Sequence, residues 1–126
     1  MSQPSALVGA IVFVWFPEDE NLLEPGPKFR PALIINADDQ KRQFLVAYGT
    51  SQHTNQQRAG EITVTPLELP KLSRTTKFAI GKARWLPITP EYFCEHQSSG
   101  FSLVGFFPKK RMAELYQRAQ EVIPDL

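Results

Sequence analysis

The sequence predicts a mainly β protein: a small, strongly bent antiparallel sheet or barrel of short strands, with one helix packed on an open side. Short runs rich in β-branched and aromatic residues recur along the chain, separated by turns that contain proline, glycine and polar residues. One stretch with helical periodicity lies near the C-terminal end. With 126 residues, the chain is expected to form a single domain, 1–126, around one core.

The first part of the chain predicts a strand, a long loop and a hairpin. Residues 7–16 are rich in β-branched and aromatic side chains, and a proline ends this run. Residues 17–30 form a loop with four acidic residues, and loops of this length are usually functional or mobile. Residues 31–36 and 42–48 are two further strands, and the ADDQK segment between them carries hairpin-turn residues.

The later elements are shorter, apart from one helix. After a polar loop, residues 61–65 alternate apolar and polar side chains, as a half-buried strand does. Residues 76–80, 83–88 and 101–107 are predicted to be extended. A helix is expected over residues 108–122, because proline suits the first helical turn and the apolar positions follow helical spacing. These positions are Met112, Leu115, Tyr116, Ala119, Val122 and Ile123.

Composition narrows the possible functions. The formal net charge is +1, so a site for a polyanion must be local. The single cysteine, Cys94, permits no internal disulfide, and the apolar run 6–16 is too short to span a membrane, so we expect a cytoplasmic protein. His53 and His96 lie far apart without a cysteine pair, so we expect no metal, and no motif implies a cofactor. Glycine-rich phosphate loops and Gly-x-Ser-x-Gly are absent, which weakens most enzyme classes.

Three segments could carry chemistry. Arg30 stands where the acidic loop meets a buried strand, so it either pairs with a loop acid or faces an anion. The YGTSQ segment, 48–52, offers Thr50 and Ser51 as hydroxyl donors, or forms a simple turn. The segment 71–84 has five cations and no acid, and it either follows a phosphate backbone or is a solvated face. Its cations are Lys71, Arg74, Lys77, Lys82 and Arg84.

Hairpin geometry brings two of these segments together. In an antiparallel hairpin, the beginning of the strand 31–36 and the end of the strand 42–48 lie side by side. Arg30 and Thr50 are therefore expected to be neighbours in space. A guanidinium, a hydroxyl and loop amides that converge on one point suit a phosphate group.

In these residues the chain resembles the PemK/MazF family of toxins from bacterial toxin–antitoxin pairs. The family's opening glycine, apolar strand and proline correspond to GAIVFVWFP at 9–17. Its Arg-Pro and apolar strand correspond to RPALIIN at 30–36, and its third strand with a terminal Thr-Ser corresponds to VAYGTSQ at 46–52. Order and spacing agree across these three segments. Further on, TKF at 76–78 and LP at 86–87 resemble a pattern found in some members.

The resemblance implies an SH3-like barrel with a C-terminal α-helix, commonly a homodimer. It also implies a metal-independent endoribonuclease that cuts single-stranded RNA, and a cognate antitoxin whose partly acidic tail covers the RNA groove. The family's catalytic arginine carries over to Arg30 and its catalytic threonine to Thr50. Some members have a glutamate five positions before the arginine. Here Pro25 stands there, so Glu24 is the candidate base, with His53 as its rival.

The expected RNA contacts surround these residues, and two other functions stay open. Hydroxyls and lysines would hold phosphates, and an exposed aromatic residue would stack on a base. These contacts are Ser51, Lys28, Phe16 or Phe29, Arg74 and Lys77. The first alternative is a non-catalytic SH3-like module that binds nucleic acid or peptide, and the second is a toxin that blocks a protein target such as a topoisomerase. The expected closeness of Arg30 and Thr50 favours the nuclease.

Overall fold

Seven strands, two α-helices and three short 3-10 helices make up the described part of the chain. The computed structural model describes residues 4–95 and 100–123. The strands are β1 (Ala10–Trp15), β2 (Phe29–Asp38), β3 (Gln43–Thr50), β4 (Glu61–Val64), β5 (Thr76–Ala79), β6 (Arg84–Pro87) and β7 (Leu103–Phe106). The helices are η1 (Pro4–Leu7), η2 (Ile80–Lys82), α1 (Pro90–Phe93), η3 (Lys109–Arg111) and α2 (Met112–Val122).

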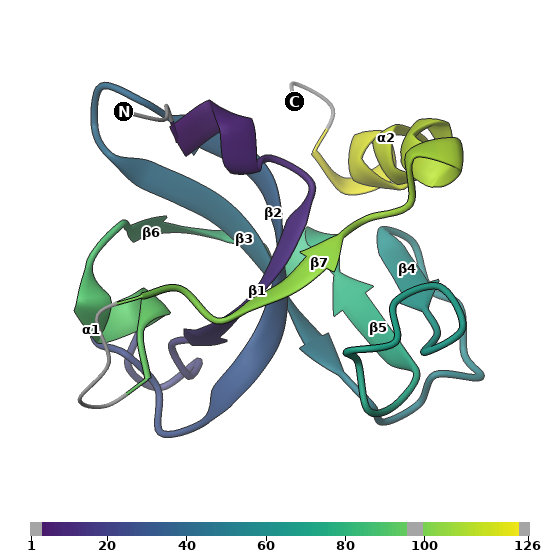
Figure 1. Ribbon diagram of the computed structural model, residues 1–126, viewed down its shortest axis with the longest axis horizontal. Coiled ribbons are helices and arrows are strands. Elements are labelled where there is room, and N and C mark those ends of the chain that lie inside the picture. The colour runs from purple at the N-terminus through teal and green to yellow at the C-terminus, as the bar shows by residue number, and fades with distance from the viewer. Residues whose placement is uncertain (1–3, 96–99, 124–126) are drawn as a thin grey trace.

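The strands form one strongly curled antiparallel sheet. Their order is β4-β5-β3-β2-β1-β7, and β6 lies beside β3. One edge of β3 is shared by two partners, because residues 43–46 pair with β6 whereas Gly49 and Thr50 pair with β5. This change of partner sends β6 to one side of the central strands and β4 and β5 to the other (Figure 1). The predicted class, mainly β with short antiparallel strands and a C-terminal helix, is confirmed.

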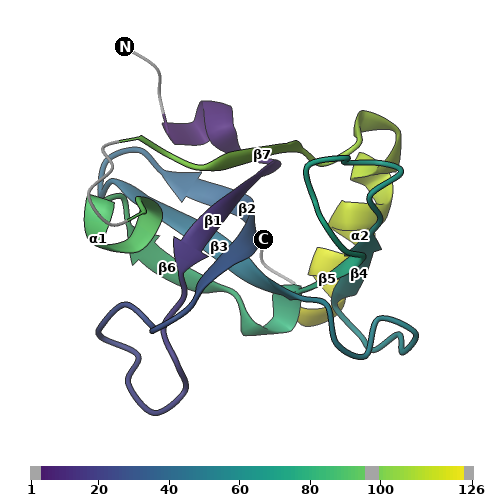
Figure 2. The same ribbon diagram turned by 60° about the horizontal axis from the view of Figure 1, so that its bottom comes forward.

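The core consists of two apolar clusters on opposite faces of the central strands. Ile11 and Leu33 belong to the cluster that packs against α2, whereas their neighbours Val12 and Ala32 belong to the cluster beside α1. Successive residues of a strand point to opposite faces, so β1 and β2 supply both clusters. Their sequences are therefore continuously apolar. Figure 2 shows α1 and α2 on opposite sides of these strands.

The predicted C-terminal helix is present in two parts. Residues 109–111 form the 3-10 helix η3, and α2 continues from Met112. Leu115 and Ala119 are buried, but Tyr116 is 58% exposed, so the apolar stripe is narrower than predicted. Neither described α-helix is long and apolar enough to cross a membrane.

Several elements differ from the prediction. The first strand begins at Ala10 rather than at residue 7, because residues 4–7 form η1 and Gly9 turns the chain with φ 94°. The helix α1 was not predicted, since four residues are too few for a periodic pattern to appear. The strand β2 begins at Phe29, so Arg30 lies inside a strand and not in the loop before it.

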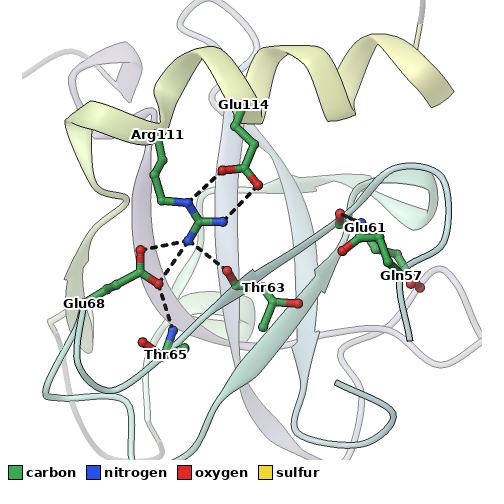
Figure 3. Close-up of polar contacts among 7 residues, drawn as sticks. All are labelled: Gln57, Glu61, Thr63, Thr65, Glu68, Arg111 and Glu114. Atoms are coloured by element: carbon green, nitrogen blue, oxygen red, sulfur yellow. Dashed lines mark hydrogen bonds and ion pairs between the residues drawn. The ribbon is translucent and has the colours of Figure 1, made fainter. Parts of the chain in front are cut away.

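Arg111 joins α2 to the loop after β4. Its guanidinium donates to Glu114 Oε1 at 2.8 Å, to Glu68 Oε2 at 2.9 Å and to the Thr63 carbonyl at 2.9 Å (Figure 3). The hydrogen bond from Arg111 lowers the pKa of Glu114, against the opposing effect of burial. Burial raises the pKa of Glu68, but hydrogen bonds from Arg111 and the Thr65 N–H outweigh it and leave that pKa below its usual value. This network fixes the helix to the sheet.

Candidate nucleic-acid interface

The central strands bring Arg30 and Thr50 to one place. Arg30 on β2 stands opposite Val14 on β1, and the β2–β3 register places Ala32 opposite Tyr48. Two residues further along each strand, the same antiparallel register leads to Arg30 and Thr50. Both residues line one hollow of about 400 Å³. The predicted closeness of Arg30 and Thr50 is confirmed.

This hollow, which we call the basic hollow, is suited to an anion. Its lining residues include four cations and no aspartate or glutamate. The cations are Lys28, Arg30, Lys71 and Arg74, and hydroxyls come from Thr50, Ser51, Ser73 and Thr76. Phosphate oxygens accept hydrogen bonds from guanidinium, ammonium and hydroxyl groups, and charge strengthens those bonds. The sequence therefore folds four of its cations around one point without a compensating carboxylate.

A second hollow, which we call the mixed hollow, shares Lys28 and Arg30 with the first. It measures about 570 Å³ and carries both signs of charge together with two aromatic rings. Its further cations are Lys82 and Arg84, its acids are Glu18, Asp19 and Glu20, and its rings are Phe16 and Tyr48. The ring centroids of Phe16 and Tyr48 are 5.3 Å apart at an interplanar angle of 49°. Half-buried aromatic faces of this kind suit the stacking of a nucleobase.

The side chain of Arg30 has no ion-pair partner among the described residues. Three acids of the loop before it line the same mixed hollow, yet no salt bridge joins any of them to Arg30 in the described part of the chain. The alternative expected from the sequence, an ion pair with a loop acid, is therefore wrong. Arg30 is half-buried, so its guanidinium can still be reached by an anion.

Gly49 explains how Thr50 reaches this position. A Cβ on Gly49 would lie 2.6 Å from Thr76 Cγ2 and 3.0 Å from the Pro31 carbonyl oxygen, so only glycine allows β3 to approach both neighbours. The next residue, Thr50, accepts a hydrogen bond from the Gln52 N–H on Oγ1 at 3.1 Å. Because this bond uses a lone pair of the hydroxyl, its proton stays available to a ligand.

Two solved structures have the same arrangement of strands and helix. The Mycobacterium tuberculosis toxin MazF-mt6 matches with a TM-score of 0.64 at 14% identity, over 91% of this chain and 96% of that chain. An endoribonuclease in complex with its cognate antitoxin, from a mycobacterial species, matches with a TM-score of 0.62 at 10% identity, over 94% of each chain. The chain has a MazF-like toxin fold. No protein-family model and no curated protein matches its sequence.

The MazF-like fold confirms the resemblance drawn from residues 9–52, at the level of the fold. Identities of 14% and 10% establish a common path of the chain and not common residue roles. The roles in this MazF-like chain must therefore come from its own geometry. That geometry places Arg30, Thr50 and Ser51 together in the basic hollow, with Phe16 in the mixed hollow next to it.

Glu24 does not meet Arg30. Its Oε2 accepts a hydrogen bond from Asn21 Nδ2 at 2.8 Å, and it lines neither hollow. Burial raises the pKa of Tyr92 in α1, and the charge of Glu24 adds to this rise, which places Glu24 on the side of α1. The structure thus gives no support to Glu24 as the base. The acids that share a hollow with Arg30 come from an earlier part of the same loop.

Lys77 and His53 also depart from their expected places. Lys77 is 4% exposed, and its Nζ lies 3.1 Å from Glu61 Oε1. The same ammonium donates to the His53 carbonyl at 3.0 Å. Lys77 is therefore engaged inside the fold, and the prediction that it contacts RNA needs correction. His53 is exposed and lines neither hollow, so its imidazole is not beside Arg30.

The basic segment 71–84 is divided between the two hollows. Lys71 and Arg74 line the basic hollow, whereas Lys82 and Arg84 line the mixed hollow. The reason is β5, whose four residues are all buried and which separates the two pairs. The sequence did contain a sign of this division: the middle of the segment includes the apolar residues of a buried strand. The positive charges on both sides of that strand made the segment look like one continuous basic surface.

The last two residues named from the sequence are His96 and Cys94. His96 lies outside the described residues. Within residues 4–95 and 100–123, no three histidine, cysteine, aspartate or glutamate side chains gather where they could hold a metal ion. Cys94 is 5% exposed, so its thiol is packed inside the fold.

Proposed function

We propose that this chain is a toxin endoribonuclease that cleaves single-stranded RNA, such as mRNA, with the scissile phosphate in the basic hollow. The observation that carries this proposal is the guanidinium of Arg30 beside Thr50. It forms no ion pair within the described part of the chain, and its hollow is lined by four cations and no carboxylate. The MazF-like fold supports it, because one similar structure is an endoribonuclease bound to its antitoxin.

The proposed reaction needs no metal. The 2′-hydroxyl of the RNA attacks the adjacent phosphorus while the bond from phosphorus to the 5′-oxygen breaks. The leaving 5′-oxygen takes up a proton from solvent water, so the products are a 2′,3′-cyclic phosphate and a 5′-hydroxyl. Negative charge grows on the phosphoryl oxygens, and Arg30 stabilises it because it stays cationic and presents a planar fork. A positioned donor of this kind is worth about 3 kcal/mol of transition-state stabilisation. The hydroxyl group of Thr50 donates a hydrogen bond to the same oxygens.

The two hollows divide the rest of the substrate between them. Lys71 and Arg74 bind a phosphate next to the scissile one, and Ser51 adds a hydroxyl. The rings of Phe16 and Tyr48 in the mixed hollow stack on a base. The proton of the 2′-hydroxyl passes to a carboxylate of the loop that lines the mixed hollow, since these acids share that hollow with Arg30.

We propose an antitoxin as the protein partner, and a homodimer as the assembly. A partly acidic antitoxin tail would bring carboxylates to four cations that have no acid beside them in the basic hollow. An acidic peptide that occupies the hollow would then compete with RNA. Competition in a cleavage assay tests the partner, and the mass of the protein in solution tests the homodimer.

The deciding experiment incubates purified protein with a long single-stranded RNA in excess EDTA. We expect cuts at recurring sites, with 2′,3′-cyclic phosphate and 5′-hydroxyl ends. DNA of the same sequence should stay intact, and one 2′-deoxy substitution at a cut nucleotide should abolish that cut alone. Intact RNA in the presence of folded protein contradicts the proposal. Saturable RNA binding without products would favour a binding module.

A further inference from the structure

Lys77 is the only buried charged residue in the described part of the chain. Removing an ammonium from water costs several kcal/mol unless it is paired and hydrogen-bonded. Here its Nζ meets two acceptors, Glu61 Oε1 at 3.1 Å and the His53 carbonyl at 3.0 Å. Buried ion pairs can often be replaced by apolar residues without loss of stability. The placement of this pair therefore calls for a reason other than stability.

The position of Lys77 suggests that the ion pair serves the candidate site. On β5 it stands directly opposite Thr50 of β3, and cross-strand partners in an antiparallel pair share a face of the sheet. The ammonium therefore lies next to the end of the strand that carries Thr50. Lys77 Nζ then reaches past this strand end to the loop that follows it, where it meets the His53 carbonyl.

The loop 51–60 is held at both ends by the same ion pair. Near its start, His53 has φ 57°, in the left-handed region that non-glycine residues rarely adopt. Such a conformation persists where the surroundings hold it in place, and the His53 carbonyl accepts bonds from both Lys77 and the Gln56 N–H. Near its end, Glu61 Oε1 accepts the Arg58 N–H at 3.1 Å. The first residue of the loop, Ser51, lines the basic hollow.

We propose that Lys77 is a positioning residue. Through the His53 carbonyl it fixes the loop 51–60, and so holds Ser51, and Thr50 beside it at the end of β3, in place for the phosphate. This inference rests on the proposed function. A catalytic donor must keep its place within a fraction of an ångström, and a displacement of about 1 Å can reduce a rate about 100-fold. Lys77 thus affects cleavage without touching RNA.

The test is the double variant Lys77→Met/Glu61→Gln. It removes both charges together, so no unpaired charge stays buried and the fold should be kept. We expect kcat for RNA cleavage to fall about 10-fold to 100-fold with little change in KM, because the four cations of the basic hollow are untouched. Glu61→Gln alone leaves the buried ammonium without its carboxylate, so Tm should fall, but kcat should stay near the wild-type value because Lys77 still donates to the His53 carbonyl.

A matched control separates positioning from stability. Arg111→Met/Glu68→Gln also removes an ion pair between elements, at 2.9 Å, and Arg111 and Glu68 have no polar contact with the loop 51–60 among the described residues. We expect this control to lower Tm and to leave kcat unchanged. A loss of kcat in the control as large as that in the Lys77 variant would overturn the inference.

A second readout does not depend on cleavage. Amide hydrogen exchange should rise at least about 10-fold at Gln56, whose N–H donates to the His53 carbonyl, in Lys77→Met/Glu61→Gln and not in the control. Unchanged exchange at Gln56 overturns the inference whether or not RNA is cut. If the wild type fails to cleave RNA, the proposed function fails, and the exchange result still decides whether Lys77 holds the loop.

Discussion

Arg30 combines two properties that single residues seldom have together. Its backbone is locked in a central strand between β1 and β3, and its half-buried guanidinium has no ion pair among the described residues. A backbone that is held in place reduces the entropy that is lost when the side chain binds a phosphate. Lysine would keep the charge at this place but would lose the planar fork.

At the same scale, Gly49 should tolerate no side chain. In Gly49→Ala the new Cβ would press on Thr76 Cγ2 at 2.6 Å and on the Pro31 carbonyl oxygen at 3.0 Å. We expect the free energy of unfolding to fall by about 1–3 kcal/mol, as overpacking usually costs, and RNA cleavage to fall because Thr50 moves. Urea denaturation measures the first effect.

The matched control is Gly100→Ala, because a Cβ at Gly100 would meet no atom of the described residues within 4 Å, its chain neighbours aside. Its stability should equal that of the wild type. Equal stability of Gly49→Ala and Gly100→Ala would show that the approach of β3 to its neighbours is not tight, and would remove the reason given for the position of Thr50.

At the scale of elements, the loop 17–28 should weaken the binding of phosphates, because its carboxylates repel them. Its acids Glu18, Asp19 and Glu20 line the mixed hollow beside Arg30. In the triple variant Glu18→Gln/Asp19→Asn/Glu20→Gln, we expect binding of a non-cleavable 2′-O-methyl RNA to tighten. The gain should be roughly fivefold to tenfold, from about 0.3–0.5 kcal/mol per charge removed. Fluorescence anisotropy at constant salt measures it.

The same variant should cleave RNA more slowly, because the proposed proton acceptor is gone. Glu24→Gln is its control on the same loop, since Glu24 lines neither hollow and should change neither binding nor cleavage. Weaker binding by the triple variant would mean that the carboxylates attract the RNA and do not repel its phosphates.

The contact between α2 and the loop after β4 should depend on pH. The pKa values of Glu68 and Glu114 are lower in the folded chain than their usual value of 4.5, through hydrogen bonds from Arg111 that outweigh burial. As the pH falls below about 5, the unfolded chain therefore takes up protons first, and the free energy of unfolding decreases. Solvent screens this partly exposed network, so the effect is modest.

Arg111→Met should flatten this dependence. Urea denaturation at pH 7 and at pH 4 should show a smaller difference in the free energy of unfolding for the variant than for the wild type. An equal difference in both proteins would mean that Arg111 does not depress the two pKa values.

Contacts between residues close in the sequence could be predicted, whereas contacts between distant segments could not. The closeness of Arg30 and Thr50 follows from a local hairpin, in which a bulge between Ile34 and Asn36 shifts the register by one residue. The place of Glu24 could not be predicted, because the loop is closed by Gly26, which lies so near the Phe16 carbonyl oxygen that a Cβ would overlap it. The buried state of Lys77 depends on Glu61, a partner on another strand, which no local pattern reveals.

For the whole molecule, charge is close to balanced and yet unevenly distributed. The net charge is +1, while the basic hollow gathers four cations without an acid. Each phosphate contact to single-stranded RNA contributes about −0.7 to the slope of log K against log salt concentration. We therefore expect a slope of about −3 for a non-cleavable RNA, and a change of about 0.7 toward zero in Lys71→Ala.

Binding measured at several salt concentrations tests this distribution. An exposed lysine far from the hollow, Lys41 in the β2–β3 turn, provides the control, and Lys41→Ala should keep the wild-type slope. A slope near zero for the wild type would mean that few phosphates are bound, and would contradict the basic hollow as the RNA site.

The most direct test of the central claim is the single-turnover cleavage rate of Arg30→Ala on single-stranded RNA in excess EDTA. We expect a rate at least about 100-fold below the wild type, with an unchanged circular dichroism spectrum, since Arg30 forms no ion pair in the described structure. Arg42→Ala, which alters an exposed arginine in the β2–β3 turn, should cleave at the wild-type rate. Undiminished cleavage by Arg30→Ala would contradict the claim that Arg30 stabilises the scissile phosphate.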